Sequence, residues 1–343
     1  MVKTLYLRNT IGWFGNKTGY EQLVKYTKGE VSVVNLHRGF VLSKVGSLIA
    51  IIAGWPREGP QSLANFEFLC RRRLMSTDCS HLLYAELNLE LLVCFESVPR
   101  DIVATLHLPR KQWQQRQIEL LGRLNSAILL YQRDLEFFEG HVGKGRVKFI
   151  HYGVDIEFFT PAEHPRNTLP RVLFSGVYLR NESMLVRLIS RLHIQRPDLQ
   201  FDLLVPKHHR GSDSLKPLLD HPAVTWHAGL SDRELRDLYQ RSTMMLLPMK
   251  DSGANTAVVE AMASGLPVVT TDVGGIRDYG GGELYPVFAD NDDQNMLDYV
   301  NELLDDEIRR IELSKSVREF AVKNLAWPLI AEKHIVAYQE LCG

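Results

Sequence analysis

The sequence predicts an α/β protein made of two doubly wound domains, each built on a parallel sheet. Short apolar runs rich in β-branched residues alternate with amphipathic runs along the chain, as strands and helices do in such domains. A polar segment with three prolines, residues 160–170, separates two alternating series. The 343 residues suffice for two hydrophobic cores. Ligands of such sheets bind beyond the carboxyl ends of the strands, so we expect the site in a cleft between the domains.

The first series begins with a strand followed by a glycine-bearing loop at 12–19. Its strands are expected over 2–7, 31–34, 47–53, 81–84, 102–107, 127–131 and 148–152, and its helices over 20–27, 63–75, 86–94, 112–123 and 134–140. The second series predicts strands over 171–175, 200–205, 224–227, 244–247, 268–271 and 283–287. Its helices are expected over 182–195, 232–241, 257–264, 292–304, 307–322 and 328–341.

The composition narrows the class of protein. A hydrophobic content of 45% and a charged content of 24% are typical of globular proteins, and the net charge of −1 gives no reason to expect a nucleic-acid partner. The four cysteines lack CxxC spacing, which favours a reducing compartment. The first residues do not resemble a signal peptide, and the most apolar run, 45–54, is too short to span a bilayer. We therefore expect a cytoplasmic protein.

The charge is unevenly distributed. Residues 1–155 carry 20 Lys and Arg against 14 Asp and Glu, and the remainder carries 20 against 27. A basic first half favours an anionic partner. The basic residues at 71–73 and 110–116 fit peripheral contact with the inner face of a membrane or a phosphorylated acceptor, and they fit a solvated charged face equally well.

The stretch 247–275 contains the most informative residue of the chain. It is predicted to form a strand, a loop, a helix, a turn and a second strand, with Thr256 capping the helix and Gly265 ending it. The helix is otherwise apolar or small, so the carboxylate of Glu260 must face a cleft, a partner or a ligand. The preceding loop, which contains Gly253, would aim backbone N–H groups and the positive helix end beyond the strands. We expect an anionic ligand there, typically a phosphate.

Four segments, in the family's order, resemble the retaining GT-B glycosyltransferases of family 4, the group 1 type. They are KFIHYGVDIEFFTP at 148–161, RVLFSG at 171–176, VTWHAGLSDRELRDLYQRSTMMLLP at 224–248 and VVEAMASGLPVVTTDVGG at 258–275. The tail, 327–341, is similar to the family's terminal helix, which crosses back to the first domain. The likeness covers most of residues 100–343. It is specific because all of the segments occur together, whereas any one of them alone would be a weak signal.

The resemblance implies a GT-B fold, in which two doubly wound Rossmann-like domains face a central cleft. Residues 1–155 would bind the acceptor, with the helix 327–343 packing back on them, and residues 156–326 would bind the donor. The implied reaction moves a sugar from a UDP- or GDP-linked nucleotide-diphosphate sugar to a hydroxyl of a glycan, a lipid-linked or a small-molecule acceptor, with retention at the anomeric carbon. It needs no cofactor and no metal, and the sequence shows no HExxH motif or Cys/His cluster with ligand spacing.

The resemblance also assigns roles to residues of the donor loop. Glu260 matches the second glutamate of the family's paired motif, which binds ribose hydroxyls. Asn255 and Thr256 would hold the diphosphate through backbone donors, although plain capping explains Thr256 equally well. The first glutamate of the motif should lie eight positions earlier, where this chain has Ser252. Either the neighbouring Asp251 replaces it through a shifted loop, or the sugar is held differently, or activity has been lost.

The remaining candidate site residues are two cations, a histidine and two glycines. Arg180 is the leading candidate for neutralising the leaving diphosphate, with Lys250 as a second cation. His107, at the end of a predicted strand, matches the family histidine near the reacting carbon. Gly15 and Gly19 would let the backbone approach the phosphates. The plain alternatives are a solvated arginine, a structural histidine and a simple turn.

Two other functions are weighed against the transferase. A non-catalytic GT-B-like module, which binds nucleotide sugar or partners a related enzyme, is motivated by Ser252 and by Val177, where the family places a cation. An NAD-dependent enzyme is disfavoured because GxGxxG does not follow the first strand.

Overall fold

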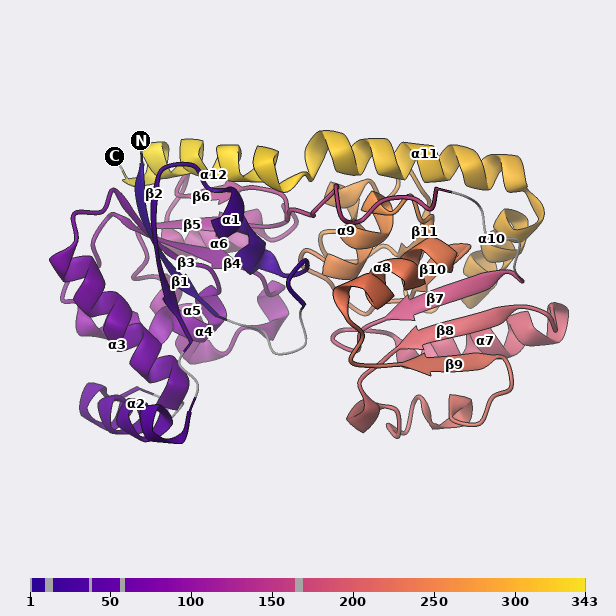
Figure 1. The fold of residues 1–343 in the computed structure, drawn as a ribbon, viewed down its shortest axis with the longest axis horizontal. Coiled ribbons are helices and arrows are strands. Elements are labelled where there is room, and N and C mark those ends of the chain that lie inside the picture. Colours follow the sequence, from indigo (N-terminus) through magenta and orange to yellow (C-terminus); the bar gives the residue numbers. More distant parts are fainter. Residues whose placement is uncertain (1, 10–14, 37–38, 56–58, 164–168, 343) are drawn as a thin grey trace. The chain divides into compact units, whose positions relative to one another are not determined.

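The computed structural model describes residues 2–9, 15–36, 39–55, 59–163 and 169–342, which divide into two compact units (Figure 1). The first unit comprises Met1–Phe14, Gly19–His151 and Trp327–Gly343, and the second comprises Gly15–Thr18 and Tyr152–Ala326. The chain therefore leaves the first unit after His151 and returns to it at Trp327. Gly12 of the predicted glycine loop lies outside the described residues.

The first unit is built on a six-stranded parallel sheet with the strand order β2-β1-β3-β4-β5-β6. Its strands are β1 (Lys3–Arg8), β2 (Glu30–Asn35), β3 (Cys79–Leu82), β4 (Ile102–Leu106), β5 (Ser126–Leu129) and β6 (Val147–Phe149). Its helices are η1 (Tyr20–Gln22), α1 (Leu23–Tyr26), α2 (Phe40–Ala53), α3 (Gly59–Leu74), α4 (Ala85–Asn88), η2 (Leu89–Cys94), η3 (Arg110–Gln112), α5 (Gln115–Leu121), α6 (Leu135–Val142) and α12 (Trp327–Cys342).

The second unit has the same architecture, a six-stranded parallel sheet with the order β12-β11-β10-β7-β8-β9. Its strands are β7 (Arg171–Ser175), β8 (Gln200–Leu204), β9 (Val224–His227), β10 (Met244–Leu247), β11 (Val268–Thr271) and β12 (Val287–Phe288). Its helices are α7 (Glu182–Gln195), η4 (Lys207–His209), η5 (Lys216–Leu218), α8 (Asp232–Arg241), α9 (Thr256–Ala263), η6 (Ile276–Tyr279), α10 (Asp293–Asp305) and α11 (Glu307–Asn324). The predicted pair of doubly wound sheets is thereby confirmed.

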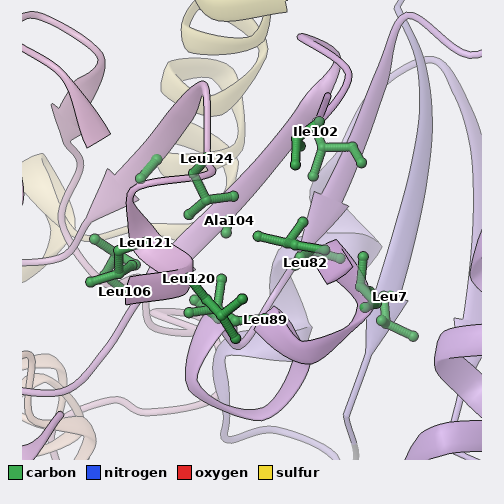
Figure 2. Close-up of a cluster of buried hydrophobic side chains, with 14 of the residues drawn as sticks. Leu7, Leu82, Leu89, Ile102, Ala104, Leu106, Leu120, Leu121 and Leu124 are labelled. Atoms are coloured by element: carbon green, nitrogen blue, oxygen red, sulfur yellow. The ribbon is translucent and has the colours of Figure 1, made fainter. Parts of the chain in front are cut away.

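Alternating apolar residues of the first sheet build its core. Side chains from β1, β3 and β4 meet those of η2, α5 and the turn after α5, and nearly all are leucines. Figure 2 shows this cluster, in which Leu7, Leu82 and Leu106 lie on the strands and Leu89 and Leu121 on the helical segments. The continuous burial of β4 on both faces is typical of a central parallel strand.

One predicted strand is wrong, because residues 47–53 lie in helix α2. Their β-branched apolar run looked like a buried strand, but α2 packs against α3 through small residues. A Cβ on Gly46 would lie 1.6 Å from the carbonyl oxygen of Gly59, and a Cβ on Gly59 would lie 2.1 Å from the carbonyl oxygen of Ser43. The predicted strand 283–287 is also largely wrong. Leu284 lies in a turn, where its N–H donates to the Gly280 carbonyl (2.8 Å), so β12 covers Val287–Phe288 alone.

Helix α12 is joined to the first unit by a chain of hydrogen bonds between buried side chains. Its members, in order, are Tyr6, Tyr338, His81, Thr105, Tyr20 and His334, with successive polar atoms 2.6 to 3.2 Å apart. Burial lowers the pKa of His334 to about 4 and that of His81 well below its usual range, so both imidazoles are neutral at pH 7. This polar chain fixes α12 against the sheet. None of the helices in the described ranges combines the length and apolar character that crossing a bilayer requires.

Candidate functional site

The candidate site of the second unit lies where its strand order reverses, between β7 and β10. Ligands of doubly wound sheets bind at this switch point. The loop after β7 and the loop after β10 are joined there, since Arg180 and Met249 form an antiparallel bridge and the N–H of Lys250 donates to the Leu179 carbonyl (2.9 Å). Both loops therefore occupy the carboxyl edge of the sheet.

The loop after β7 has an unusual backbone. Gly176 has a φ of 85°, and Leu179 has a φ of 57°, which is uncommon for a residue with a Cβ. A Cβ on Gly176 would lie 2.9 Å from Nη2 of Arg180. Strained conformations of this kind concentrate at functional sites, where the surrounding structure holds them.

Arg180 is held by this loop. Its Nε donates to the Ser175 carbonyl (2.9 Å), and its Nη1 donates to the Tyr178 carbonyl (3.1 Å) and contacts the Met249 sulfur at 3.3 Å. Burial lowers the pKa of Arg180 to about 10, so the guanidinium is still charged at neutral pH. A fixed cation at the switch point is suited to binding an anion.

Glu260 lies on α9 with only 4% of its surface exposed. The hydroxyl of Tyr239 donates to Oε2 (2.9 Å), and that of Thr18 donates to Oε1. Burial raises the pKa of Glu260 to about 7, although both hydroxyls oppose the shift. Each carboxylate oxygen has two lone pairs, so the group retains the capacity to accept two further hydrogen bonds.

The segment 15–18 brings Thr18 to this carboxylate. The backbone N–H groups of Asn16 and Lys17 donate to the Asp232 carboxylate at 2.9 and 3.4 Å. The Lys17 ammonium forms an ion pair with Asp155 (2.9 Å). A Cβ on Gly15 would lie 1.9 Å from Asp232 Oδ1, so glycine is required for this approach. In this structure Gly15 therefore accommodates a carboxylate.

The loop before α9 holds most of the predicted donor residues. Asn255, not Thr256, is the N-cap: its side chain accepts from the N–H of Val258 (3.4 Å), and the predicted cap at Thr256 is wrong because the helix begins there. The Lys250 side chain is exposed. The Asp251 carboxylate accepts the N–H of the next residue, Ser252 (2.9 Å).

Ser252, which stands where the family motif has a glutamate, faces the protein interior. Its side chain is buried and its hydroxyl donates to the Gly253 carbonyl (3.0 Å). Its own carbonyl accepts the N–H of Gly275 (3.0 Å), and a Cβ on Gly274 would lie 1.6 Å from that oxygen. The loop is thus locked to the turn after β11, and Ser252 supplies no charge.

His107 belongs to the first unit, at the end of β4. Its Nε2–H donates to the Leu83 carbonyl (2.8 Å), and its ring stacks on Tyr84 with centroids 4.4 Å apart and meets the edge of Tyr20 at 4.8 Å. Burial lowers its pKa to about 4. His107 is therefore a neutral imidazole with Nδ1 as its acceptor atom.

Sequence reasoning missed two carboxylates near this histidine: Glu86, which accepts its backbone N–H, and Glu21, which contacts its stacking partner Tyr84. The Glu86 carboxyl accepts backbone N–H groups of Glu86 and His107, and among the described residues its buried Oε2 has no hydrogen-bond partner. Burial raises the pKa of Glu86 to about 8. Glu21 accepts from the Tyr84 hydroxyl (2.9 Å), and burial raises its pKa. A Cβ on Gly19, whose φ is 99°, would lie 2.4 Å from Glu21 Oε2, so here Gly19 makes room for this carboxylate.

The predicted residues thus form two clusters, one in each unit. Arg180 and Glu260 lie in the second unit and both neighbour Tyr239, while His107 lies in the first. Tyr239 and Thr18 were not predicted, and the only sequence signal for Glu86 was its place just after a predicted strand. Among the residues that the structure describes, no group of three or more His, Cys, Asp or Glu side chains is arranged to hold a metal ion.

Comparisons with known sequences identify similar proteins. The family model described as Glycosyl transferases group 1 matches residues 170–306. The MMP alpha-(1->4)-mannosyltransferase of Mycolicibacterium hassiacum is 29% identical over 195 residues, 55% of this chain and 47% of that protein. The D-inositol 3-phosphate glycosyltransferase of Corynebacterium urealyticum is 25% identical over 244 residues, 63% of this chain and 57% of that protein. The matches therefore span about half the length of these relatives.

The comparisons with solved structures concern the whole fold. The sucrose-phosphate synthase of Thermosynechococcus elongatus superposes with a TM-score of 0.74 at 15% identity, over 99% of each chain. Anabaena HepE in complex with UDP and glucose superposes with a TM-score of 0.70 at 14% identity, over 99% of this chain and 100% of that one. The predicted GT-B fold is confirmed.

Proposed function

We propose that this chain transfers a sugar from a nucleotide-diphosphate sugar to a hydroxyl acceptor, as the match of residues 170–306 to the family model of group 1 glycosyl transferases suggests. The observation that carries the proposal is the pairing, at the switch point of the second sheet, of a buried carboxylate at Glu260 with a fixed guanidinium at Arg180. A nucleoside diphosphate offers what these groups bind: hydroxyls that donate and phosphates that accept.

In this proposal the second unit binds the donor. Two ribose hydroxyls donate to Glu260, which can accept two more hydrogen bonds beside those from Tyr239 and Thr18. The diphosphate lies against Arg180 and the start of α9, where backbone N–H groups around Asn255 and Thr256 and the positive helix end favour an anion. The loop before α9 is assigned to contact the donor as well, through Lys250, Asp251, Ser252 and Gly253.

The proposed chemical step breaks the bond between the anomeric carbon and the phosphate oxygen, and the diphosphate leaves with the electron pair. The acceptor oxygen bonds to the same face of that carbon and its proton passes to the leaving phosphate oxygen, which gives retention. Arg180 and Lys250 stabilise the charge that develops, so the protein supplies the electrostatic stabilisation itself. Retention and independence from metal are both part of the proposal.

The first unit is proposed to bind the acceptor. His107 is assigned to orient the reacting sugar, because its neutral imidazole offers Nδ1 to a sugar hydroxyl. Gly15 and Gly19 are assigned to let the backbone of residues 15–19 approach the phosphates of the donor. The acceptor class is a glycan, a lipid-linked or a small-molecule hydroxyl, and the UDP in the HepE structure supports uridine as the donor base.

The test is turnover with a panel of UDP- and GDP-sugars in the presence and absence of EDTA, with release of nucleoside diphosphate as the readout. We expect one donor to be turned over with and without EDTA. Arg180→Ala and His107→Ala should each lower kcat by about 100-fold or more, as removal of a stabilising donor usually does. Full activity of both variants would refute the site assignment.

A second candidate function is a non-catalytic module that binds nucleotide sugar. It is favoured by Ser252, whose buried hydroxyl donates to a backbone carbonyl where the family has a carboxylate. Thermal shift against UDP, GDP and their sugars would identify a ligand in either case, because a ligand that binds only the folded state stabilises it. Stabilisation without turnover of any donor would establish the module in place of the enzyme.

A further inference from the structure

Helix α2 of the first unit exposes large apolar side chains along its whole length. Two of its fourteen residues, Gly46 and Ala50, are buried, and several apolar residues are among the most exposed of the chain. We call the exposed set the outer face of α2. It consists of Phe40, Val41, Leu42, Val45, Leu48, Ile51 and Ile52, which are 42% to 79% exposed.

The distribution of size around α2 is the reverse of that in an ordinary surface helix. Small residues, Ser43, Gly46 and Ala50, face α3, where a Cβ on Gly46 would overlap the backbone of Gly59. At about 100° per residue, the outer face covers roughly 200° of the circumference. A soluble surface helix would place its large apolar residues inward and its charges outward. Figure 1 shows α2 at the edge of the first unit, lying against α3.

The charge on this helix pair is basic. Helix α2 contains no acidic residue, and its one charged side chain, Lys44, lies 4.4 Å from the ring of Phe40 within the outer face. Together, α2 and α3 carry four basic residues and one acidic residue. A lysine in this position can extend its ammonium toward headgroups while its stem lies among apolar side chains.

We propose that the outer face of α2 docks this protein on a bilayer surface with anionic headgroups. The apolar side chains would enter the boundary between headgroups and acyl chains, and Lys44 would reach phosphate groups. Because the outer face wraps roughly 200° of the helix circumference, a flat protein face could cover only part of it, whereas a fluid bilayer can surround it. A second copy is less well suited, because seven side chains fall short of the about 20–30 residues a side that stable protein interfaces use.

Two of the basic residues considered from sequence pair with carboxylates of the first unit. Arg72 pairs with Asp101, and Arg116 forms two hydrogen bonds to Glu90 at 2.7 and 2.8 Å. These guanidinium groups are engaged within the first unit. The docking proposal therefore rests on the apolar outer face of α2 and on Lys44, and it is independent of the transfer reaction.

The test is flotation of the full chain with vesicles of phosphatidylcholine alone and of phosphatidylcholine with one quarter phosphatidylglycerol. We expect the protein to float with the anionic vesicles. Ile52→Glu, at a position that is 79% exposed, should reduce the bound fraction by about tenfold or more, because it replaces an inserted apolar side chain with a charge. The matched control is Ile194→Glu on α7 of the second unit, which is 80% exposed and should leave flotation unchanged.

Size-exclusion chromatography with light scattering completes the design. A protein that stays in the aqueous fraction with both vesicle types, or equal flotation of Ile52→Glu and the parent chain, would overturn the proposal. A dimer that Ile52→Glu converts to monomer without any vesicle binding would also overturn it and would assign the outer face of α2 to a second copy. Since both substitutions are at exposed positions, unfolding is not expected, and circular dichroism verifies this.

Discussion

Glu260 and Glu86 are buried carboxylates in the two units, and their surroundings differ. Glu260 accepts hydrogen bonds from the hydroxyls of Tyr239 and Thr18, one on each oxygen. Glu86 accepts backbone N–H groups, and its Oε2 has no partner among the described residues. Burial raises the pKa of both, to about 7 and about 8. Hydroxyl partners keep Glu260 close to ionisation at neutral pH, as its proposed contact with ribose hydroxyls requires, whereas Glu86 is mostly protonated and can donate.

The largest expected difference between the two carboxylates is in nucleotide affinity. Glu260→Gln should weaken binding of the preferred nucleoside diphosphate by about 100-fold, since two charge-assisted hydrogen bonds are each worth about 1.5–3 kcal/mol and the amide retains part of them. Glu86→Gln should change the affinity by less than about twofold. Isothermal titration calorimetry measures both. Equal losses in the two variants would contradict the assignment of the nucleotide to Glu260.

The second expected effect is the pH dependence of nucleotide binding. Ribose hydroxyls favour the ionised form of Glu260, whose pKa is raised to about 7, so affinity should increase from pH 6 to pH 8. One proton gives at most about a tenfold change per pH unit. The nucleotide phosphate also titrates near pH 6, so the measurement is the difference in slope between the parent chain and Glu260→Gln. Parallel slopes would contradict the role of Glu260.

The third effect concerns stability in alkali. The raised pKa of Glu86 means that the folded state binds the proton more tightly than the unfolded state. This contribution is complete below the unfolded pKa, near 4.5, and is lost as the pH rises through about 8. Glu86→Gln should therefore reduce the fall in the free energy of unfolding between pH 5 and pH 9 by about 4 kcal/mol, at about 1.4 kcal/mol per pH unit between pH 5 and pH 8. Urea denaturation at both pH values tests this, and an unchanged fall would show that Glu86 is hydrated.

The smallest effect is expected at Thr18, which donates to Glu260. Thr18→Val keeps the shape and removes one donor, so nucleotide affinity should fall by no more than about fivefold, equivalent to about 1 kcal/mol. Thr27→Val is the matched control. It removes a hydroxyl that bonds to the side chain of Tyr6 in the first unit, and it should leave nucleotide affinity unchanged. A loss as large as that of Glu260→Gln would mean that Thr18 itself contacts the nucleotide.

Much of the second unit could be predicted because its signals are local. The predicted bounds of β7, α7 and α8 coincide with those of the structure. In α8, Ser231 and Glu234 form a capping box, which is visible in the sequence as a short motif. Glu260 could be singled out because burying a lone carboxylate in an apolar helix costs free energy unless a partner or ligand compensates for it.

The wrong or missing predictions concern features that depend on interactions between residues far apart in the sequence. Thr18 and Glu260 are 242 positions apart, so no local pattern indicates their contact. Helix α2 was missed altogether, and a strand was predicted over residues 47–53, because the rule that places large apolar residues inward fails there. The apolar run 47–53 favoured a buried strand, whereas Leu48, Ile51 and Ile52 are exposed. Only the position of α3, set by Gly46 and Gly59, reveals which face of α2 is inside.

The hydrogen-bonded chain that fixes α12 has a consequence for the order in which the protein is made. The first unit needs His334 and Tyr338 to complete its buried polar chain, but these residues are translated after the whole of Tyr152–Ala326. The second unit can therefore fold on the ribosome while the first still exposes Tyr6, Tyr20 and His81. Domains usually fold in the order of their synthesis. Here, the part that begins first at the ribosome is the part that finishes last.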